Sequence, residues 1–255
     1  MKIPYKYSLL MAALAILLCF GCSKNSSSTD PGLVSNTGTG GSLAKFTIVG
    51  DYMYAVDGSN SSYLYAFNIS DSSKITFVSK TYIGFGIETI FPYNNKLFIA
   101  SNTGMFIYQL NNPAQPVQEN YVNHFNGCDP VVVSGNYAYL TIHGGTRCNG
   151  STINQLQVYD VSSLYYPQLV HTVNLDNPFG LAVHNNYLFV CDNGTGIRTF
   201  DISNPMIPQQ LSITTGENFV DLIPIDSILV CMLTDGVSFY DMKQPENLIH
   251  LKTVQ

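Results

Sequence analysis

Phe200-Asp201-Ile202-Ser203 is a short run of an aromatic residue, an acid, an aliphatic residue and a polar turn residue. The same order recurs at Phe67-Asn68-Ile69-Ser70, Tyr108-Gln109-Leu110-Asn111, Tyr159-Asp160-Val161-Ser162 and Tyr240-Asp241-Met242-Lys243. The five aromatic residues are spaced 41, 51, 41 and 40 residues apart. A fixed period of about 40 residues indicates a repeat architecture.

A second motif precedes the first in every repeat: a polar turn followed two or three residues later by an aromatic residue. It occurs at Gly50–Tyr54, Asn94–Phe98, Gly135–Tyr139, Asn185–Phe189 and, in degraded form, Ile225–Leu229. Leu229 is therefore assigned to the fifth aromatic position. The two motifs are furthest apart in the third repeat, which predicts an insertion of roughly nine residues within 143–155.

Each repeat also contains four short apolar segments separated by turn residues. In the fourth repeat they are residues 179–183, 187–191, 196–202 and 209–213. Runs rich in Val, Ile, Tyr and Phe between Asn, Gly and Pro residues predict strands. Four antiparallel strands per repeat are typical of a propeller blade. We therefore expect an all-β fold, a five-bladed β-propeller of four-stranded antiparallel blades over residues 45–255, with repeats at about 45–84, 85–126, 127–176, 177–217 and 218–255.

The repeat resembles a known family. Residues Gly196–Pro205 and Val133–Leu140 resemble the LVIVD repeat of bacterial surface and secreted proteins. The resemblance implies propeller blades, and it implies no enzymatic activity or catalytic residues.

The N-terminus sets the expected compartment. Lys2 and Lys6 precede an apolar run of signal-peptide length that ends at Gly21-Cys22. This junction resembles a bacterial lipoprotein cleavage box of the Bacteroidota type. The resemblance implies a signal peptide over 1–21, lipidation of Cys22 and attachment to the outer membrane, on either of its faces. The alternative is an ordinary secretory signal whose removal takes Cys19 and Cys22 with it.

Residues 22–44 predict how the domain is attached, and the charge of the chain limits the classes of partner it can bind. The Ser-, Gly-, Thr- and Asn-rich segment after Cys22 predicts a flexible tether. Removal of the signal leaves 9 basic against 17 acidic residues. This acidic balance argues against nucleic acid and limits membrane contact to the lipid anchor. We expect a monomer, with dimerisation as the alternative.

The cysteines suggest one disulfide and two packing residues. Cys128 begins the first strand of the third repeat and Cys148 lies in its insertion, so the two can meet across antiparallel strands. We expect a Cys128–Cys148 disulfide, with a metal site that includes His143 and His124 as the weaker alternative. Cys191 and Cys231 are assigned to one repeat column of small residues, which predicts buried free thiols.

The loops after each second strand and between blades lie on one face of a propeller, where ligands commonly bind. The residues that could bind a ligand there are Glu88, His124, Asp129, His143, Arg147, Phe179, Phe219 and Asp221. Aromatic rings beside polar groups suit a sugar or a peptide. The alternative for Phe85, Phe125, Phe179 and Phe219 is packing between blades.

Two groups of aspartates receive different interpretations. Asp221 aligns with a column of apolar residues. It therefore either lines the channel with a raised pKa, or faces trapped water or hydrogen-bonds to a neighbouring blade. Asp160, Asp201 and Asp241 recur after the third-strand aromatic residue. We expect them to accept backbone N–H bonds and to close the turns that follow.

No catalytic or cofactor-binding motif is present, so we assign no catalytic residue, cofactor or metal. The sequence favours a non-enzymatic binding or scaffold module for a protein or glycan partner at the cell envelope. The alternative is an enzyme acting on glycans or a small metabolite, for which at least two channel carboxylates must converge. A third alternative is a purely structural envelope component.

Overall fold

Twenty strands make up the protein in a computed structural model, which describes residues 41–57, 62–123, 130–145, 152–216 and 218–255. These residues belong to one compact unit, residues 35–255. The predicted signal peptide, Cys22 and nearly all of the tether lie outside the described residues, as do His124, Cys128, Asp129, Arg147 and Cys148. No helix of the described part is long and apolar enough to cross a membrane.

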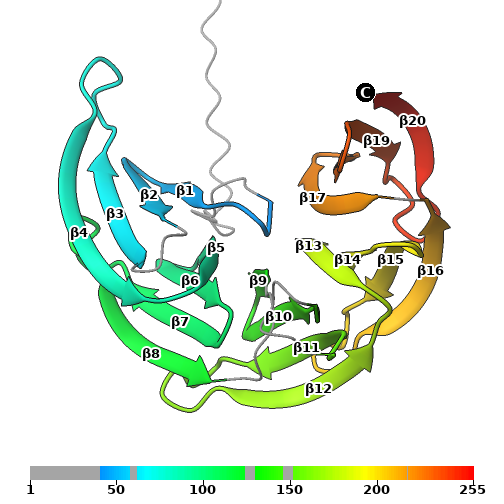
Figure 1. Cartoon of the computed structure of the whole chain (residues 1–255), viewed down its shortest axis with the longest axis horizontal. Coiled ribbons are helices and arrows are strands. Elements are labelled where there is room, and N and C mark those ends of the chain that lie inside the picture. Colours follow the sequence, from blue (N-terminus) through cyan, green and yellow to red (C-terminus); the bar gives the residue numbers. More distant parts are fainter. Residues whose placement is uncertain (1–40, 58–61, 124–129, 146–151, 217) are drawn as a thin grey trace, which may run out of the picture. The chain divides into compact units, whose positions relative to one another are not determined.

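The strands form five antiparallel sheets of four consecutive strands each (Figure 1). Blade one contains β1 (Phe46–Val49), β2 (Tyr52–Val56), β3 (Ser62–Asn68) and β4 (Thr76–Gly84). Blade two contains β5 (Ile87–Tyr93), β6 (Lys96–Ser101), β7 (Gly104–Gln109) and β8 (Val117–Asn123). Blade three contains β9 (Val131–Ser134), β10 (Tyr137–Ile142), β11 (Gln155–Asp160) and β12 (Gln168–Asn174). Blade four contains β13 (Pro178–His184), β14 (Tyr187–Asp192), β15 (Gly196–Asp201) and β16 (Gln209–Thr215). Blade five contains β17 (Phe219–Ile225), β18 (Ile228–Leu233), β19 (Val237–Asp241) and β20 (Ile249–Val254). The five-bladed propeller predicted from the repeat is thereby confirmed.

The recurrent aspartates close turns, as predicted. Asp160, Asp201 and Asp241 each accept a hydrogen bond from the backbone N–H two residues later, at 2.8, 2.7 and 2.9 Å. The side-chain hydrogen bond from Ser203 and the backbone bond from the same residue lower the pKa of Asp201. Asn68 accepts the equivalent bond from Ser70 in blade one. The motif is therefore structural in these four blades.

The register of the fifth repeat corrects the sequence alignment by one residue. Leu229 pairs with Tyr240 as Leu188 pairs with Phe200 in blade four. Val230, rather than Leu229, thus occupies the position of Phe189. A slip of one residue moves each side chain to the opposite face of its sheet, so the residues of this strand face the other way from the prediction.

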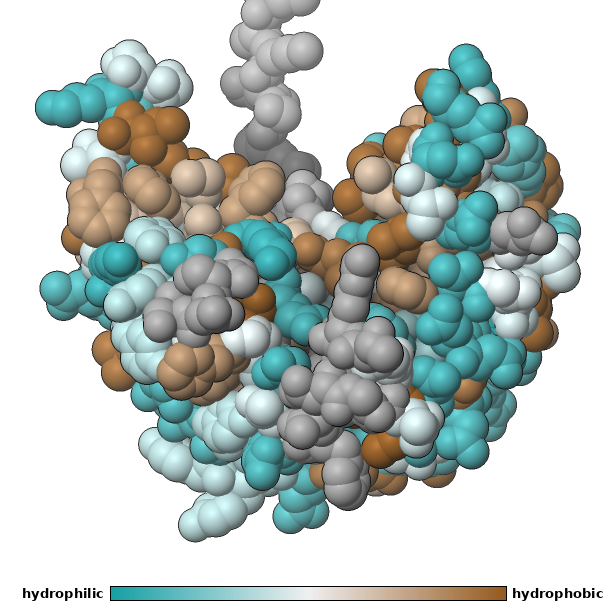
Figure 2. All heavy atoms as spheres, viewed as in Figure 1, coloured by the Kyte–Doolittle hydropathy of each residue, from teal (hydrophilic) through white to brown (hydrophobic). Residues whose placement is uncertain are grey.

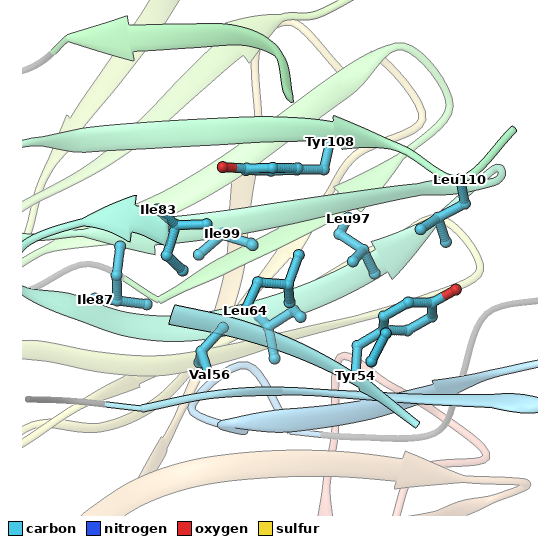
Figure 3. Close-up of a cluster of buried hydrophobic side chains, with 11 residues drawn as sticks. Tyr54, Val56, Leu64, Ile83, Ile87, Leu97, Ile99, Tyr108 and Leu110 are labelled. Carbon is cyan, nitrogen blue, oxygen red and sulfur yellow. The ribbon is translucent and has the colours of Figure 1, made fainter. Parts of the chain in front are cut away.

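Apolar clusters join consecutive blades. The face of a blade that is turned toward the next blade in sequence is here called its forward face, and the opposite face its backward face. In each cluster the forward face of one blade packs on the backward face of the next. Figure 3 shows the cluster between blades one and two, in which Tyr54 and Leu64 meet Leu97 and Tyr108. Similar clusters join blades two and three, three and four, and four and five. Among the described residues no such cluster joins blade five to blade one. These two blades lie at the two ends of the blade series (Figure 1).

Candidate functional site

Asp221 lies on β17, the innermost strand of blade five, and is held by the segment that precedes blade one. Ser42 Oγ donates to Asp221 Oδ1 at 2.9 Å and the Leu43 backbone N–H donates to Oδ2 at 3.2 Å. Ser42 Oγ also accepts from the Leu181 backbone N–H at 2.7 Å. Ala44 O accepts from the Ile90 N–H at 2.9 Å. Residues 41–44, here called the strap, therefore link the inner strands of blades two, four and five.

Two glycines allow this close approach. A Cβ built on Gly41 would lie 2.0 Å from Asp221 Oδ2, and one built on Gly180 would lie 2.3 Å from Asp221 Oδ1. Any side chain at either position would displace the carboxylate. The strand register also places Asp221 beside the column of apolar residues, since Leu222 occupies the place of Leu181. The predicted alignment of Asp221 with that column was wrong by one residue, for the same reason as at Val230.

Asp221 lies in a largely buried environment. Its side chain is buried, and this desolvation raises its pKa above the ordinary value while the bonds from Leu222, Ser42 and Leu43 oppose the rise. Both carboxylate oxygens already accept hydrogen bonds from the protein itself. The carboxylate is therefore engaged in holding the strap. Its partners Ser42 and Leu43 precede blade one, whereas the predicted alternative was a hydrogen bond to a neighbouring blade.

His143 and Phe179, two of the residues assigned to the loop face, lie together. Phe179 also packs against the cluster between blades four and five, which was the alternative for this residue. The rings of His143 and Phe179 stack at 4.7 Å between centroids with 27° between planes. Thr141 Oγ1 donates to the Phe179 carbonyl oxygen and fixes the backbone beneath the pair. Both side chains are half-buried. Phe179 is followed on β13 by Gly180, the residue that lies against the Asp221 carboxylate.

The other predicted residues have different environments. Phe219 is buried in the cluster between blades four and five and lies 6.2 Å from the Tyr240 ring, which confirms packing between blades for this residue. Phe85 is exposed, so packing between blades, the alternative given for this residue, is wrong. Glu88 is half-buried on β5. Within the described ranges no three His, Cys, Asp or Glu side chains are grouped so that they could hold a metal ion.

An ion-pair network on the same loop face was missed by the sequence analysis. Arg198 Nε lies 2.5 Å from Asp192 Oδ2, and Arg198 Nη2 lies 2.8 Å from Asp176 Oδ2. Asp192 is fully buried and also accepts the Asn177 backbone N–H at 2.6 Å. The network fixes the connection between blades three and four. Asp192 and Arg198 are six residues apart on two strands, and no motif marks such a pair in the sequence.

A small cavity lies at the opposite end of the blades, between blades two and three. Its volume is about 180 Å³ and its lining includes Tyr93, Lys96 and Leu164. Pockets for drug-sized ligands typically measure about 300–1,000 Å³. The cavity is therefore too small to be a strong candidate for a substrate site.

The largest departure from the predicted site is an exposed face at blade one. The strand register gives Phe46 the same position as Ile90, Val131, Leu181 and Leu222 in the other blades. Those four side chains are at most 1% exposed, whereas Phe46 is 59% exposed. The backward face of blade one therefore has the composition of an inter-blade junction but no blade packed against it.

Aromatic residues continue this face across β3 and β4. Tyr63 contacts Tyr82 edge-on at 5.6 Å, and Tyr82 contacts Phe85 at 6.1 Å. Phe67 and Phe77 form a further pair at 5.8 Å. The Lys80 ammonium lies 3.8 Å from the Tyr63 ring centroid. Brown and tan side chains gather on blade one and on blade five in Figure 2.

The two described cysteines are buried free thiols, as predicted. Cys191 lies on the forward face of blade four and Cys231 on the backward face of blade five, within one cluster. Burial raises the pKa of both, and the neighbouring Cys231 raises that of Cys191 further. The corrected register, however, places the two in different repeat columns. They face one another across a junction.

The comparisons with known proteins agree with this architecture. The family model for the LVIVD repeat matches residues 128–146 and 179–213, which supports the repeat family in blades three and four. A comparison with curated protein sequences gave no match.

Several solved structures share the fold. A periplasmic gluconolactonase of Pseudomonas aeruginosa is 15% identical, with a TM-score of 0.62 over 81% of this chain and 67% of its own. A protein from Lactobacillus plantarum is 13% identical, with a TM-score of 0.62 over 82% and 69%. A protein of unknown function from Desulfotomaculum acetoxidans is 10% identical, with a TM-score of 0.64 over 80% and 68%. At these identities the likeness concerns the fold alone. The protein therefore has the β-propeller fold, with LVIVD-repeat matches in two segments, and it spans about two thirds of the length of these chains.

Proposed function

We propose that the protein is an envelope-anchored binding module that docks a partner protein on the backward face of blade one. The observation that carries the proposal is the exposure of Phe46 at a position that every other blade buries. Exposed contiguous apolar patches on a soluble domain commonly mark interaction sites. The face is a sheet surface rather than a cleft, which suits a protein surface better than a small molecule.

A protein partner fits this face better than a glycan. Sugar rings stack on flat, accessible aromatic faces, but Lys80 already lies over the Tyr63 ring. Tyr63, Tyr82 and Phe85 are also inclined to one another at 70° and 83° instead of forming a flat platform. Apolar side chains such as Phe46 and Ile48 extend the face beyond the aromatic residues.

An enzymatic function is less favoured because the carboxylate of Asp221, the acid on the inner strand of blade five, is already hydrogen-bonded to the strap. Asp221, buried and bonded to Ser42 and Leu43, has no oxygen without a protein donor. The likeness to a gluconolactonase at 15% identity carries no residue of that enzyme's site to this chain.

The docking surface can be tested by retention of envelope proteins on the immobilised full-length chain. We expect at least one protein from an envelope extract to be retained by the wild type and lost with Phe46→Lys. Val117→Lys, at an exposed apolar position of an outer strand, is the matched control and should retain it. Equal retention by both variants, or no retention by the wild type, would refute the proposed surface.

The anchor is the second part of the proposal and rests on the sequence around Cys22. Cleavage at Gly21 and acylation of Cys22 would attach the propeller to the outer membrane. We expect the wild type to partition into the detergent phase of Triton X-114 and Cys22→Ser to move to the aqueous phase. Detergent partitioning of Cys22→Ser equal to that of the wild type would contradict lipidation at this cysteine.

A further inference from the structure

We propose that the partner is a second copy of this chain, whose blade five packs its forward face on the backward face of blade one. The inference rests on the proposed function, because it names the partner of the same face. The contact would repeat, between two chains, the junction that this chain forms between its own blades. It would be head-to-tail, since the two faces belong to opposite ends of the blade series.

The forward face of blade five is open in the same way as the backward face of blade one. The register gives Met232 the position of Val56, Ala100, Thr141 and Cys191. Those four side chains are at most 6% exposed, whereas Met232 is 40% exposed. Val237 and Phe239 are also only partly buried, although Met105 and Ile107 at the same positions of blade two are fully buried. Both end blades thus carry an unfinished junction.

The two open faces correspond to the two sides of a junction that this chain already forms between its own blades. Every junction within the chain joins a forward face to a backward face, as Phe189 and Cys191 of blade four meet Leu229 and Cys231 of blade five. Met232 and Ala55 are the end-blade equivalents of Cys191 and Cys231. A second copy supplies the matching surface for each end, so no other protein needs to provide it.

The strap contacts the inner strand of blade five. Gly41 lies against Asp221 and Ile223 of β17. Met232 on β18 and Phe239 on β19 remain accessible to another chain.

Repeat proteins generally require terminal repeats with a polar outer face to remain soluble as single chains. Neither end blade has one: Phe46 and Ile48 are exposed at one end and Met232 at the other. A head-to-tail contact builds a ring when its rotation closes and a filament when it does not. Because the chain carries a net charge of −6, added salt should screen repulsion between copies and favour the contact.

Crosslinking between two different variants tests the contact directly. Full-length chains with Ala55→Cys and with Met232→Cys are mixed and treated with a short bis-maleimide. We expect the mixture to give a covalent product of twice the chain mass. Its amount should be well above that given by either variant alone or by the unsubstituted chain. The native cysteines of the unsubstituted chain provide the background. Absence of this excess in the mixture would overturn the proposal.

The chain that carries both substitutions distinguishes a second copy from closure within one chain. Products of two or more chains support the second copy, whereas a product confined to single chains overturns it. The mass of the wild type, followed by sedimentation at rising concentration, should increase and should fall back to one chain with Met232→Lys. Leu211→Lys, exposed on β16 of blade four, is the control and should associate like the wild type. Circular dichroism must show that both variants fold.

The failure of this inference can be separated from that of the proposed function. If the wild type stays at the mass of one chain, and an envelope protein is retained by the wild type but not by Phe46→Lys, the second copy is refuted and the docking surface stands. A wild type that associates through Met232 supports both.

Discussion

Blade four and blade one are built from the same repeat, yet their equivalent residues have opposite environments. Leu181 of blade four is fully buried between two neighbours, while Phe46 of blade one is mostly exposed. The difference does not lie in the residue type, since both are large and apolar. It lies in the neighbour: blade four has a blade on each side and blade one has a blade on only one. Burial in a repeat protein is therefore a property of the junction, and the end blades show what each junction contributes.

The largest expected effect compares a closed junction with an open one. Phe189→Ala removes a fully buried ring between blades four and five and should lower the free energy of unfolding by about 3–5 kcal/mol. Phe46→Ala should change it by less than about 0.5 kcal/mol, as for other exposed positions. Urea unfolding at a concentration where the chain is a monomer measures both. An equal loss in the two variants would mean that the open junction closes in solution.

The next effect concerns the ion-pair network of blade four, which has no counterpart among the described residues of blade one. Arg198→Met removes the cation that faces the buried Asp192 carboxylate. Removing one partner of a buried pair typically costs about 3–5 kcal/mol, and we expect the lower end of this range because Asp192 keeps its backbone donors. Lys243→Met removes the exposed pair with Asp241 and is the matched control, with no measurable loss expected. Equal unfolding midpoints in urea would show that the Arg198 pair is not important for stability.

A smaller effect should come from the strap, whose bonds to Asp221 are the polar contacts described between blade five and the segment before blade one. Ser42→Ala removes a donor to Asp221 and an acceptor for the Leu181 N–H. Leaving buried polar groups without partners costs about 1–3 kcal/mol. Ser72→Ala in an exposed turn should have no effect. Thermal unfolding of the two variants compares them, and identical transitions would show that the strap does not stabilise the propeller.

The smallest effect depends on pH. Because burial raises the pKa of Asp221 in the folded state, the protonated form favours folding. This contribution is complete below the ordinary carboxyl pKa and is lost as the pH rises through the raised value. Relative to Asp221→Asn, the wild type should therefore lose stability from acid toward neutral pH. Urea unfolding across that range measures the difference, and a gain in relative stability would mean that the pKa is lowered instead.

The fold was predictable because it depends on local and recurring signals. The period, the turn-closing aspartates and the strand pattern of repeats one to four all carry over into the structure. The fifth repeat was misaligned at Ile225–Leu229 because it lacks the aromatic residue and the Asn or Gly of the other turns. A weak motif fixes the number of strands but not their register, and the register decides which face a residue occupies.

The site was less predictable because its contacts are distant in sequence. Ser42 and Asp221 are 179 residues apart, and a Ser in a Ser- and Gly-rich segment gives no sign of a buried partner. The exposure of Phe46 was equally hidden, since its sequence is that of a buried strand. The pairing of His143 with Phe179 was partly predictable because the sequence assigned both residues to the same face, although Phe179 lies on β13 and not on a loop.

The strap also has a consequence for the order of folding. It joins a residue near the start of the propeller to the inner strand of the last blade, so this contact is among the most non-local in the chain. Loop-closure entropy opposes such contacts until the intervening chain is organised, and folding slows as contacts become less local. We expect blades one to four to acquire hydrogen-exchange protection before Ser42 meets Asp221. The strap would then be the last element to dock, once blade five has formed.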